Sequence, residues 1–228
     1  MRVLIIIPAY NEEDSIKKVV DNLKLTNPTV DYVVVNDCSK DRTEAILRQN
    51  GINHISLPQN LGIGGAVQSG YLYAKEKGYD IAIQMDGDGQ HPAEEISKLT
   101  ELIKNGTADM VVGSRFVTKD GFQSTALRRF GIKFLSGLIK LRIHRRVYDV
   151  TSGFRAVNTK GIELFASNYA QDYPEPESLI TAAKAGLKIS EVPVTMKERQ
   201  GGVSSISSFK SAYYMIKVSL AILLGGSY

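Results

Sequence analysis

The chain has 228 residues, 43% of them hydrophobic, which is enough to form a substantial core and argues against bulk disorder. Its one cysteine, Cys38, excludes an internal disulfide and a cysteine-rich zinc site. A formal net charge of +4 and a pI near 9.0 favour polyanionic partners such as nucleotides or phospholipid surfaces. The sequence has no zinc-finger or aromatic-basic RNA-binding signature, so we expect no nucleic acid partner.

The first half of the chain alternates apolar runs with segments of helical spacing. Expected strands cover residues 3–7, 32–35, 52–57, 79–83 and 110–112, and expected helices cover 16–23, 45–47, 66–77 and 96–103. This alternation predicts a single α/β domain with a mostly parallel sheet and helices on both faces. Ligands of such sheets bind at the carboxyl ends of the strands, where Asp37 and Asp86 fall.

The second half is less regular. We expect a helix at 127–143, a turn entering a short strand at 151–155, a helix at 179–185 and a strand at 189–194. Residues 200–208 are rich in Gly and Ser. We assign residues 1–207 to one domain and residues 208–228 to an amphipathic C-terminal segment.

The C-terminal segment has two interpretations. Its aromatic residues, lysines and short apolar stripe suit a helix that lies in a bilayer interface, and the basic run 142–146 would add attraction to anionic lipid. Alternatively it is a terminal helix packed on the domain. From the pattern of its first residues we expect no signal peptide, and no run reaches the roughly 20 apolar residues that span a bilayer. We therefore expect a cytoplasmic protein, peripheral on the inner face of the plasma membrane.

The acidic segment Asp86-Gly87-Asp88-Gly89-Gln90 directly follows an expected buried strand. Two carboxylates so close repel each other, and a divalent cation removes that cost. Oxygen ligands suit Mg²⁺ or Mn²⁺, and Mg²⁺ is commonly held by one or two carboxylates together with substrate phosphates. The segment therefore favours a metal that holds a diphosphate. The alternative is an acidic turn that caps the next helix.

Six short motifs occur in an order that resembles family 2 glycosyltransferases of the GT-A fold (the nucleotide-diphospho-sugar transferase fold), and in particular dolichyl- and polyprenyl-phosphate sugar synthases. The motifs are Ile7-Pro8-Ala9-Tyr10-Asn11-Glu12, Val35-Asn36-Asp37-Cys38-Ser39-Lys40-Asp41, Asn60-Leu61-Gly62-Ile63-Gly64-Gly65-Ala66, Asp86-Gly87-Asp88-Gly89-Gln90-His91-Pro92, Gly113-Ser114-Arg115 and Thr151-Ser152-Gly153-Phe154-Arg155. The family usually has Gly at the position of Cys38, which we interpret as a structural residue and not a nucleophile.

The resemblance implies a role for each matching residue. Nucleotide-sugar binding is implied for Pro8, Tyr10, Glu12, Asp37, Gly64, Asp86, Gly87 and Asp88. Metal binding is implied for Asp86, Asp88 and Gln90, with His91 as a supporting residue and not a ligand. Acceptor binding is implied for Arg128, Arg129 and Arg199. Catalytic roles are implied for Asp88, Arg115, Glu177 and Arg199. For each arginine the alternative is a solvated surface charge.

The resemblance implies a metal-dependent, inverting transfer from a nucleotide-diphospho-sugar donor to a polyprenyl phosphate, and it allows a small membrane protein as a partner. Glu175 and Glu177 keep a second acceptor open. A saccharide hydroxyl, free or lipid-linked, needs a general base, whereas a lipid phosphate with a second pKa near ~6 is already largely ionised. A non-catalytic nucleotide-binding partner of a membrane assembly is the alternative from another class. The Asp-x-Asp segment argues against a receiver-type signalling domain, which only Asn36-Asp37 suggests.

Overall fold

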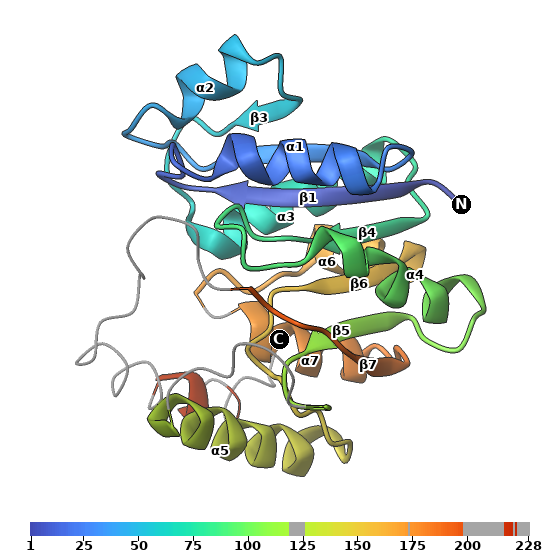
Figure 1. Ribbon diagram of the computed structural model, residues 1–228. Helices are drawn as coiled ribbons and strands as arrows, with labels where there is room; N and C mark the ends of the chain where they lie inside the picture. Colours follow the sequence, from blue (N-terminus) through green and yellow to red (C-terminus); the bar gives the residue numbers. More distant parts are fainter. Residues whose placement is uncertain (119–125, 173, 198–216, 221, 223–228) are drawn as a thin grey trace.

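The computed structural model describes residues 1–118, 126–172, 174–197, 217–220 and 222 (Figure 1). Their strands form one seven-stranded sheet of order β3-β2-β1-β4-β6-β5-β7. Every neighbouring pair is parallel except the two pairs that contain β6. The strands are β1 (Val3–Ala9), β2 (Asp31–Asn36), β3 (His54–Ser56), β4 (Ile81–Gln84), β5 (Met110–Ser114), β6 (Arg155–Asn158) and β7 (Ile189–Pro193).

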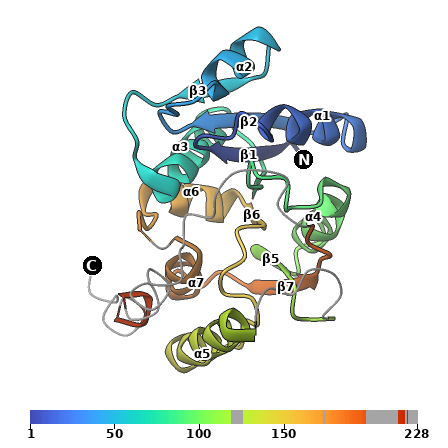
Figure 2. The ribbon, with the colours of Figure 1, turned by 60° about the vertical axis from the view of Figure 1, so that its left-hand side comes forward.

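Helices cover both faces of the sheet (Figure 2). One hydrophobic core lies under α3, α5, α6 and α7, and a second lies under α1, α2, η1 and α4. The helices are α1 (Ile16–Thr26), α2 (Thr43–Gln49), α3 (Gly62–Glu76), the short 3₁₀ helix η1 (Ala93–Glu95), α4 (Ile96–Lys104), α5 (Ala126–Ile143), α6 (Thr159–Ser167) and α7 (Pro174–Lys184). The predicted mostly parallel α/β architecture is confirmed.

Strand β1 shows why its sequence is apolar throughout. Leu4 and Ile6 belong to the core under α3, and Ile5 and Ile7 belong to the core under α1. All seven residues of the strand are buried, because a central parallel strand has helices on both sides. Because β1 lies between β2 and β4, its carboxyl end and the loop that follows lie centrally at the edge of the sheet where the parallel strands end.

The structure differs from the sequence-based expectation at several elements. Strand β6 is antiparallel to both neighbours, and α6, which was not predicted, follows it directly. Helix α3 begins at Gly62, four residues before its expected start. Helix α7 begins at Pro174, five residues before its expected start. Proline is tolerated in the first turn of a helix because backbone N–H groups there have no acceptor within the helix, so the lack of an N–H in proline loses no hydrogen bond.

Much of the C-terminal segment lies outside the described residues. Residues 217–220 are helical, with Val218 and Ile222 fully buried in the core under α3 and α5. This described part of the segment packs on the domain. Among the described residues, no helix has the length and apolar character that crossing a membrane requires.

Candidate active site

Asp37 lies at the carboxyl end of β2 and is buried. Its Oδ1 accepts a hydrogen bond of 2.7 Å from the backbone N–H of Leu61, which precedes α3. Its own N–H donates to the carbonyl of Ala9 at the end of β1 (2.9 Å), and its carbonyl accepts from the Asn60 side chain (3.0 Å). Asp37 thus joins two strand ends and the start of α3.

The loop after β1 is tied to the loop after β2. Asn11 has a left-handed backbone (φ +56°). Its N–H donates to the hydroxyl of Ser39 (3.0 Å), and its Oδ1 accepts from the N–H of Lys40 (2.8 Å). The N–H of Glu12 donates to the hydroxyl of Thr43 (2.8 Å). These contacts hold the predicted nucleoside-binding loops as one unit.

The Asp86–Gln90 turn passes close to the first loop. A Cβ placed on Gly87 would lie 3.1 Å from the carbonyl oxygen of Pro8 and 3.7 Å from Cγ of Glu12. Tyr10, in the same loop, is 43% exposed and so is available to a ligand. The structure therefore brings Pro8, Glu12 and Gly87 together, as predicted.

The backbone at Cys38 explains why the family usually has Gly at this position. Its backbone is left-handed (φ +56°), a conformation that glycine adopts without steric cost. Its Sγ lies 3.8 Å from the carbonyl of Pro58, and the residue is partly exposed. The usual Gly is therefore a conformational requirement, which Cys38 meets with some strain.

The two aspartates of the acidic segment lie in a turn just beyond β4. Oδ1 of Asp88 accepts from the backbone N–H of Gln90 at 3.0 Å, and Asp88 is buried. The carbonyl of Gln90 accepts from the N–H of Lys197 (2.9 Å), and its side-chain nitrogen lies 3.5 Å from the carbonyl of Lys197. The turn is thus fixed at its end to the residues that follow β7.

His91 fixes the start of the turn through a hydrogen bond to Asp86. Its Nδ1 accepts a 2.9 Å hydrogen bond from the backbone N–H of Asp86, which places the ring proton on Nε2. The ring stacks on Phe154, with centroids 5.1 Å apart. Nε2 lies 3.7 Å from Oδ2 of Asp86. His91 therefore positions Asp86, which agrees with its predicted supporting role.

A buried relay of polar side chains orients the Asp86 carboxylate. The hydroxyl of Tyr169 donates to Oε1 of Gln84 (3.3 Å), and Nε2 of Gln84 donates to Oδ1 of Asp86 (3.2 Å). Burial raises the pKa of Tyr169 well above 10.0, so the hydroxyl stays a donor. Sequence reasoning missed both residues. The available signal was Gln84, a polar residue that ends an otherwise apolar strand.

Arg115, predicted to stabilise the leaving group, is engaged by a partner far along the chain. Its guanidinium donates to both carboxylate oxygens of Asp149 (2.7 and 2.8 Å) and to the hydroxyl of Thr151 (3.1 Å). Burial opposes its charge, but the ion pair with Asp149 and the charge of Asp86 outweigh this and raise the pKa of Arg115. The charge of Arg115 therefore interacts with that of Asp86, and the carboxylate of Asp149 pairs with its guanidinium.

Glu175 and Glu177 have different surroundings. Burial, together with the charge of Asp86, raises the pKa of Glu175, against the opposing charge of Arg155. Burial also raises the pKa of Glu177, but the neighbouring charge there is Asp172. The charge of Glu175 thus interacts with that of Asp86, whereas the catalytic role of Glu177 stays a prediction. Fully buried Arg155 fixes this region by donating to the carbonyls of Val150, Ser152 and Glu175 and to the hydroxyl of Ser178.

The remaining predicted residues are placed as follows. Gly64 lies inside α3, and a Cβ there would come within 2.2 Å of the carbonyl of Ala170, so close packing requires glycine. Arg129 is exposed on α5. The side chain of Arg128 and the whole of Arg199 lie outside the described residues. The role of Gly64 in nucleotide-sugar binding stays a prediction, and the direct contact with Asp37 comes from Leu61, the residue before these glycines.

The donor set at the turn fits a hard divalent cation. Asp86 and Asp88 supply carboxylate oxygens and Gln90 an amide oxygen, which are ligands that Mg²⁺ and Mn²⁺ favour. The described residues contain no cluster of three or more His, Cys, Asp or Glu side chains that could hold a metal. Mg²⁺ sites in proteins commonly combine one or two carboxylates with substrate phosphates and water.

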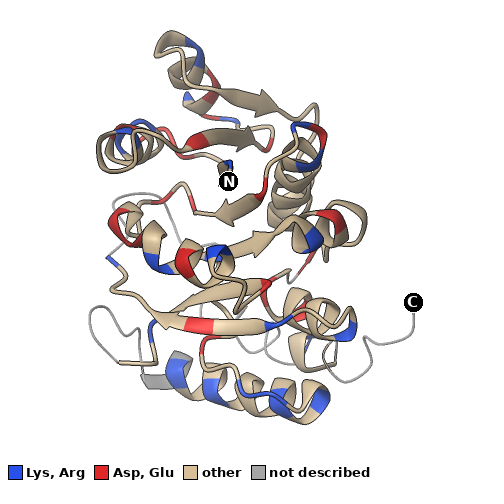
Figure 3. Ribbon diagram, turned by 90° about the vertical axis from the view of Figure 1, so that its right-hand side faces the viewer, with Lys and Arg blue, Asp and Glu red and all other residues tan. Residues whose placement is uncertain are grey.

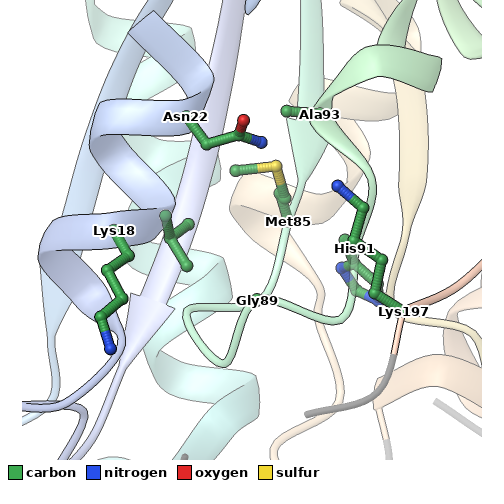
Figure 4. Close-up of a pocket in the computed structure, with 8 residues that line it drawn as sticks. Lys18, Asn22, Met85, Gly89, His91, Ala93 and Lys197 are labelled. Atoms are coloured by element: carbon green, nitrogen blue, oxygen red, sulfur yellow. The ribbon is translucent and has the colours of Figure 1, made fainter. Parts of the chain in front are cut away.

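A pocket of about 220 Å³ lies beside the turn, between α1 and the segment leading to η1 (Figure 4). Lys18 and Asn22 line it from α1, and Gly89, His91 and Lys197 line it from the other side. Nζ of Lys197 pairs with Glu94 (3.0 Å). The pocket thus lies directly against the Asp86–Gln90 turn, through Gly89.

The sheet order, the helices on both faces and the acidic turn at the ligand edge define the class of the protein: it has the GT-A glycosyltransferase fold. Glucosyl-3-phosphoglycerate synthase from Mycobacterium tuberculosis, crystallised with Mn²⁺, uridine diphosphate and glucosyl-3-phosphoglycerate, superposes with a TM-score of 0.71 at 22% identity. The match covers 98% of this chain and 79% of that one. A structure of the same enzyme contains Mg²⁺ and uridine diphosphate.

The sequence comparisons then assign the family. Residues 4–165 match Glycosyl transferase family 2, so the chain belongs to this family and is a glycosyltransferase. An undecaprenyl-phosphate mannosyltransferase from Micrococcus luteus is 32% identical over 91% of this chain and 88% of its own length. A UDP-N-acetylglucosamine–dolichyl-phosphate N-acetylglucosaminyltransferase from Methanococcus voltae is 32% identical over 97% of this chain and 98% of its own.

Proposed function

We propose that this glycosyltransferase transfers a sugar from a nucleotide-diphospho-sugar to a polyprenyl phosphate such as dolichyl or undecaprenyl phosphate. The observation that carries the proposal is the set of relatives named for this acceptor class, which align along nine-tenths or more of the chain. The acceptor is a membrane lipid, so we place the enzyme peripherally on the inner face of the plasma membrane. The comparisons do not support a small membrane protein as partner.

The contacts of Asp37 support donor binding at this edge. A carboxylate held by backbone groups at one oxygen can accept from a base N–H or a ribose hydroxyl at the other. The loop containing Tyr10 and Glu12 is hydrogen-bonded to the segment after Asp37, so a nucleoside would be bound by two loops that are fixed relative to each other. The diphosphate would then extend toward Asp86 and Asp88, which lie at the end of the strand on the other side of β1.

Asp86, Asp88 and Gln90 would hold Mg²⁺ or Mn²⁺, and such an ion supplies charge that stabilises a departing nucleoside diphosphate. Asp86 is oriented for this by Gln84 and His91. Arg115 adds positive potential near Asp86, moderated by Asp149. Charge placed where the leaving group becomes more anionic acts mainly on the transition state.

The proposed reaction is a single displacement with inversion. An oxygen of the acceptor phosphate forms a bond to the anomeric carbon, the bond from that carbon to the β-phosphate oxygen breaks, and its electron pair leaves with the nucleoside diphosphate. The phosphate is already largely ionised at neutral pH, with a second pKa near ~6, so the step needs no protein base. The chemistry therefore does not depend on Glu175 or Glu177 taking a proton.

One observation favours the second candidate, transfer to a saccharide hydroxyl. Glu175 is close enough to Asp86 for their charges to interact, and its pKa is raised, both of which suit a general base at the site. Product analysis separates the candidates. A sugar phosphodiester releases its sugar in mild acid, whereas an ordinary glycoside survives that treatment.

The test of the proposed function is a pair of assays on the wild-type enzyme and the Asp88→Ala variant. A thermal-shift screen of UDP-, GDP- and dTDP-sugars with and without Mn²⁺ identifies the donor, because a ligand of the native state raises the melting temperature. Labelled donor is then incubated with polyprenyl phosphate. We expect wild-type enzyme to form acid-labile lipid product and Asp88→Ala to lose both transfer and metal-dependent donor binding. A fully active variant would refute the site.

A further inference from the structure

Helix α5 has two apolar sides, of which one is buried. Ile132, Leu135 and Ile139 are buried and belong to the core under α3 and α7. Phe130, Phe134 and Leu141 follow the opposite side of the helix and are 72%, 49% and 69% exposed. Three large hydrophobic side chains aligned on one exposed helix face are unusual on a soluble domain, and such a patch commonly marks an interaction surface.

The charges that surround this stripe have one sign. Residues 126–143 include no Asp or Glu. Four basic residues of the helix are exposed, and the basic run continues beyond its end; they are Arg129, Lys133, Lys140 and Arg142, followed by Arg145 and Arg146. Figure 3 shows α5 as a helix with blue bands and no red ones. The surface therefore combines an apolar ridge with a strongly positive potential.

We propose that the surface formed by Phe130, Phe134 and Leu141, flanked by Lys133 and Lys140, docks on an anionic phospholipid bilayer. Aromatic and aliphatic side chains that enter the headgroup region beside basic residues bind such membranes, and each basic residue near the surface adds to the attraction. Protein–protein interfaces are instead depleted in lysine. Charge complementarity thus selects the lipid surface as the occupant.

The position of α5 in the chain connects this surface to the site. Arg115 precedes α5 by eleven residues, and Asp149 follows it by six. These two residues form a buried ion pair beside the site, so the chain before α5 and the chain after it meet at this pair. Ser136 donates to the carbonyl of Val147, which fixes the middle of α5 to the returning segment. A bilayer against α5 would lie next to the edge where a lipid acceptor must arrive.

This inference deepens the proposed function by naming the face of the domain that meets the membrane. It rests on the proposed function for the biological role of docking, whereas the docking itself is measured independently. Vesicle binding is measured without donor or acceptor, so its failure is distinguishable from a failure of sugar transfer. A protein with another acceptor would still bind vesicles through α5. A polyprenyl-phosphate transferase that docked elsewhere would transfer sugar and be insensitive to changes in α5.

The first experiment is co-sedimentation with vesicles of phosphatidylcholine alone or mixed equally with phosphatidylglycerol. We expect wild-type protein to bind the mixed vesicles and to release them in high salt. Phe130→Ser/Leu141→Ser should weaken binding by about tenfold, because two apolar side chains no longer enter the interface. Leu25→Ser/Leu72→Ser is the matched control, since these leucines are 81% and 52% exposed on α1 and α3, and it should bind as wild type.

A second pair of variants tests the charges. Lys133→Gln/Lys140→Gln should lower the affinity for mixed vesicles by roughly tenfold or more and leave binding to phosphatidylcholine unchanged. Lys104→Gln/Lys184→Gln removes the same charge from exposed positions on α4 and α7 and should have a much smaller effect. Equal losses from the two pairs would show that net charge and not α5 directs binding, and would overturn the proposal.

The sequence allows a direct test of insertion, because it has no tryptophan. Phe134→Trp should give a fluorescence spectrum that shifts to the blue with mixed vesicles and is quenched by brominated lipid. Leu25→Trp should show neither change. Unaltered fluorescence from Phe134→Trp, or wild-type affinity of Phe130→Ser/Leu141→Ser, would contradict docking through α5. Melting temperatures of all variants establish that they are folded.

Discussion

Arg115 grips the fully buried carboxylate of Asp149 with two hydrogen bonds of 2.7 and 2.8 Å. The backbone N–H groups of Tyr148 and Asp149 in turn donate to Glu191 on β7 (2.7 and 2.9 Å). The pair thus connects the end of β5 to the segment that returns from α5 and to the neighbouring strand. The pair therefore fixes the segment after β5 relative to the segment that precedes β6.

Asp149→Asn should lower the free energy of unfolding by about 3 kcal/mol, because it removes the carboxylate charge that faces the largely buried guanidinium of Arg115. Urea denaturation followed by circular dichroism measures this. The double variant Arg115→Met/Asp149→Leu removes both charges and should recover most of the loss. Equal destabilisation of the single and the double variant would contradict an electrostatic cause.

Gly153→Ala should weaken metal-dependent donor binding by roughly tenfold. The new methyl group would lie 2.8 Å from Nε2 of Gln84 and 3.2 Å from both carboxylate oxygens of Asp86, so it must displace them. Isothermal titration with the donor and Mn²⁺ measures the change. Gly137→Ala on α5 is the control, since nothing lies within 4 Å of its added Cβ and donor affinity should not change.

His91→Phe should keep the stacking on Phe154 while removing the acceptor for the Asp86 N–H. An unsatisfied buried donor costs about 1–3 kcal/mol, so the variant should be less stable. We also expect a loss of roughly tenfold in the apparent affinity for Mn²⁺, read from donor-dependent thermal shifts across a metal titration. An unchanged metal titration would mean that Asp86 keeps its position without the ring.

Glu177→Gln should change the dependence of stability on pH while preserving sugar transfer. Burial, then the charge of Asp172, raises the pKa of Glu177 above its ordinary 4.5 in the folded protein. The folded state therefore binds this proton more tightly than the unfolded state, and the free energy of unfolding falls as the pH rises through the interval just above 4.5.

The Gln variant lacks this titration. It should be more stable than wild type at pH 7, and the difference should shrink as the pH falls below 4.5, where both forms are neutral. Urea denaturation across this pH range is the measurement. Loss of turnover with intact donor binding in Glu177→Gln would instead identify a general base and favour a hydroxyl acceptor. The same assay on Glu175→Gln tests the carboxylate nearer Asp86.

The parts that local patterns could predict are those whose cause is local. The apolar runs of β1, β2 and β4 reflect burial on both faces, and they placed Asp37 and Asp86 at one edge of the sheet correctly. Glycines argue against a helix, yet α3 begins at Gly62 because α3 packs against the segment at Ala170, which only tertiary structure reveals. The sequence predicted the short strand entered at Arg155, but not the antiparallel pairing of β6 or the burial of this charged residue, which is 1% exposed.

Distance along the chain also separates the site residues that were predicted from those that were missed. The Asp-x-Asp turn and the loop at Asn11 are continuous in sequence. The partners Arg115 and Asp149 are 34 residues apart, and Tyr169 reaches Gln84 across 85 residues. A single sequence contains no signal for such pairs. It showed that Glu175 and Glu177 were both candidates, but their different neighbours emerge only from the packing of α7.

The strained backbone at Cys38 has a practical consequence. This partly exposed thiol is the chain's single cysteine and adjoins Asp37, so a sulfhydryl reagent can modify the protein at one place only, inside the loops proposed to bind the nucleoside. The rate of that modification becomes a built-in gauge of occupancy: a seated donor should shield the sulfur and slow alkylation, with no reporter group engineered in.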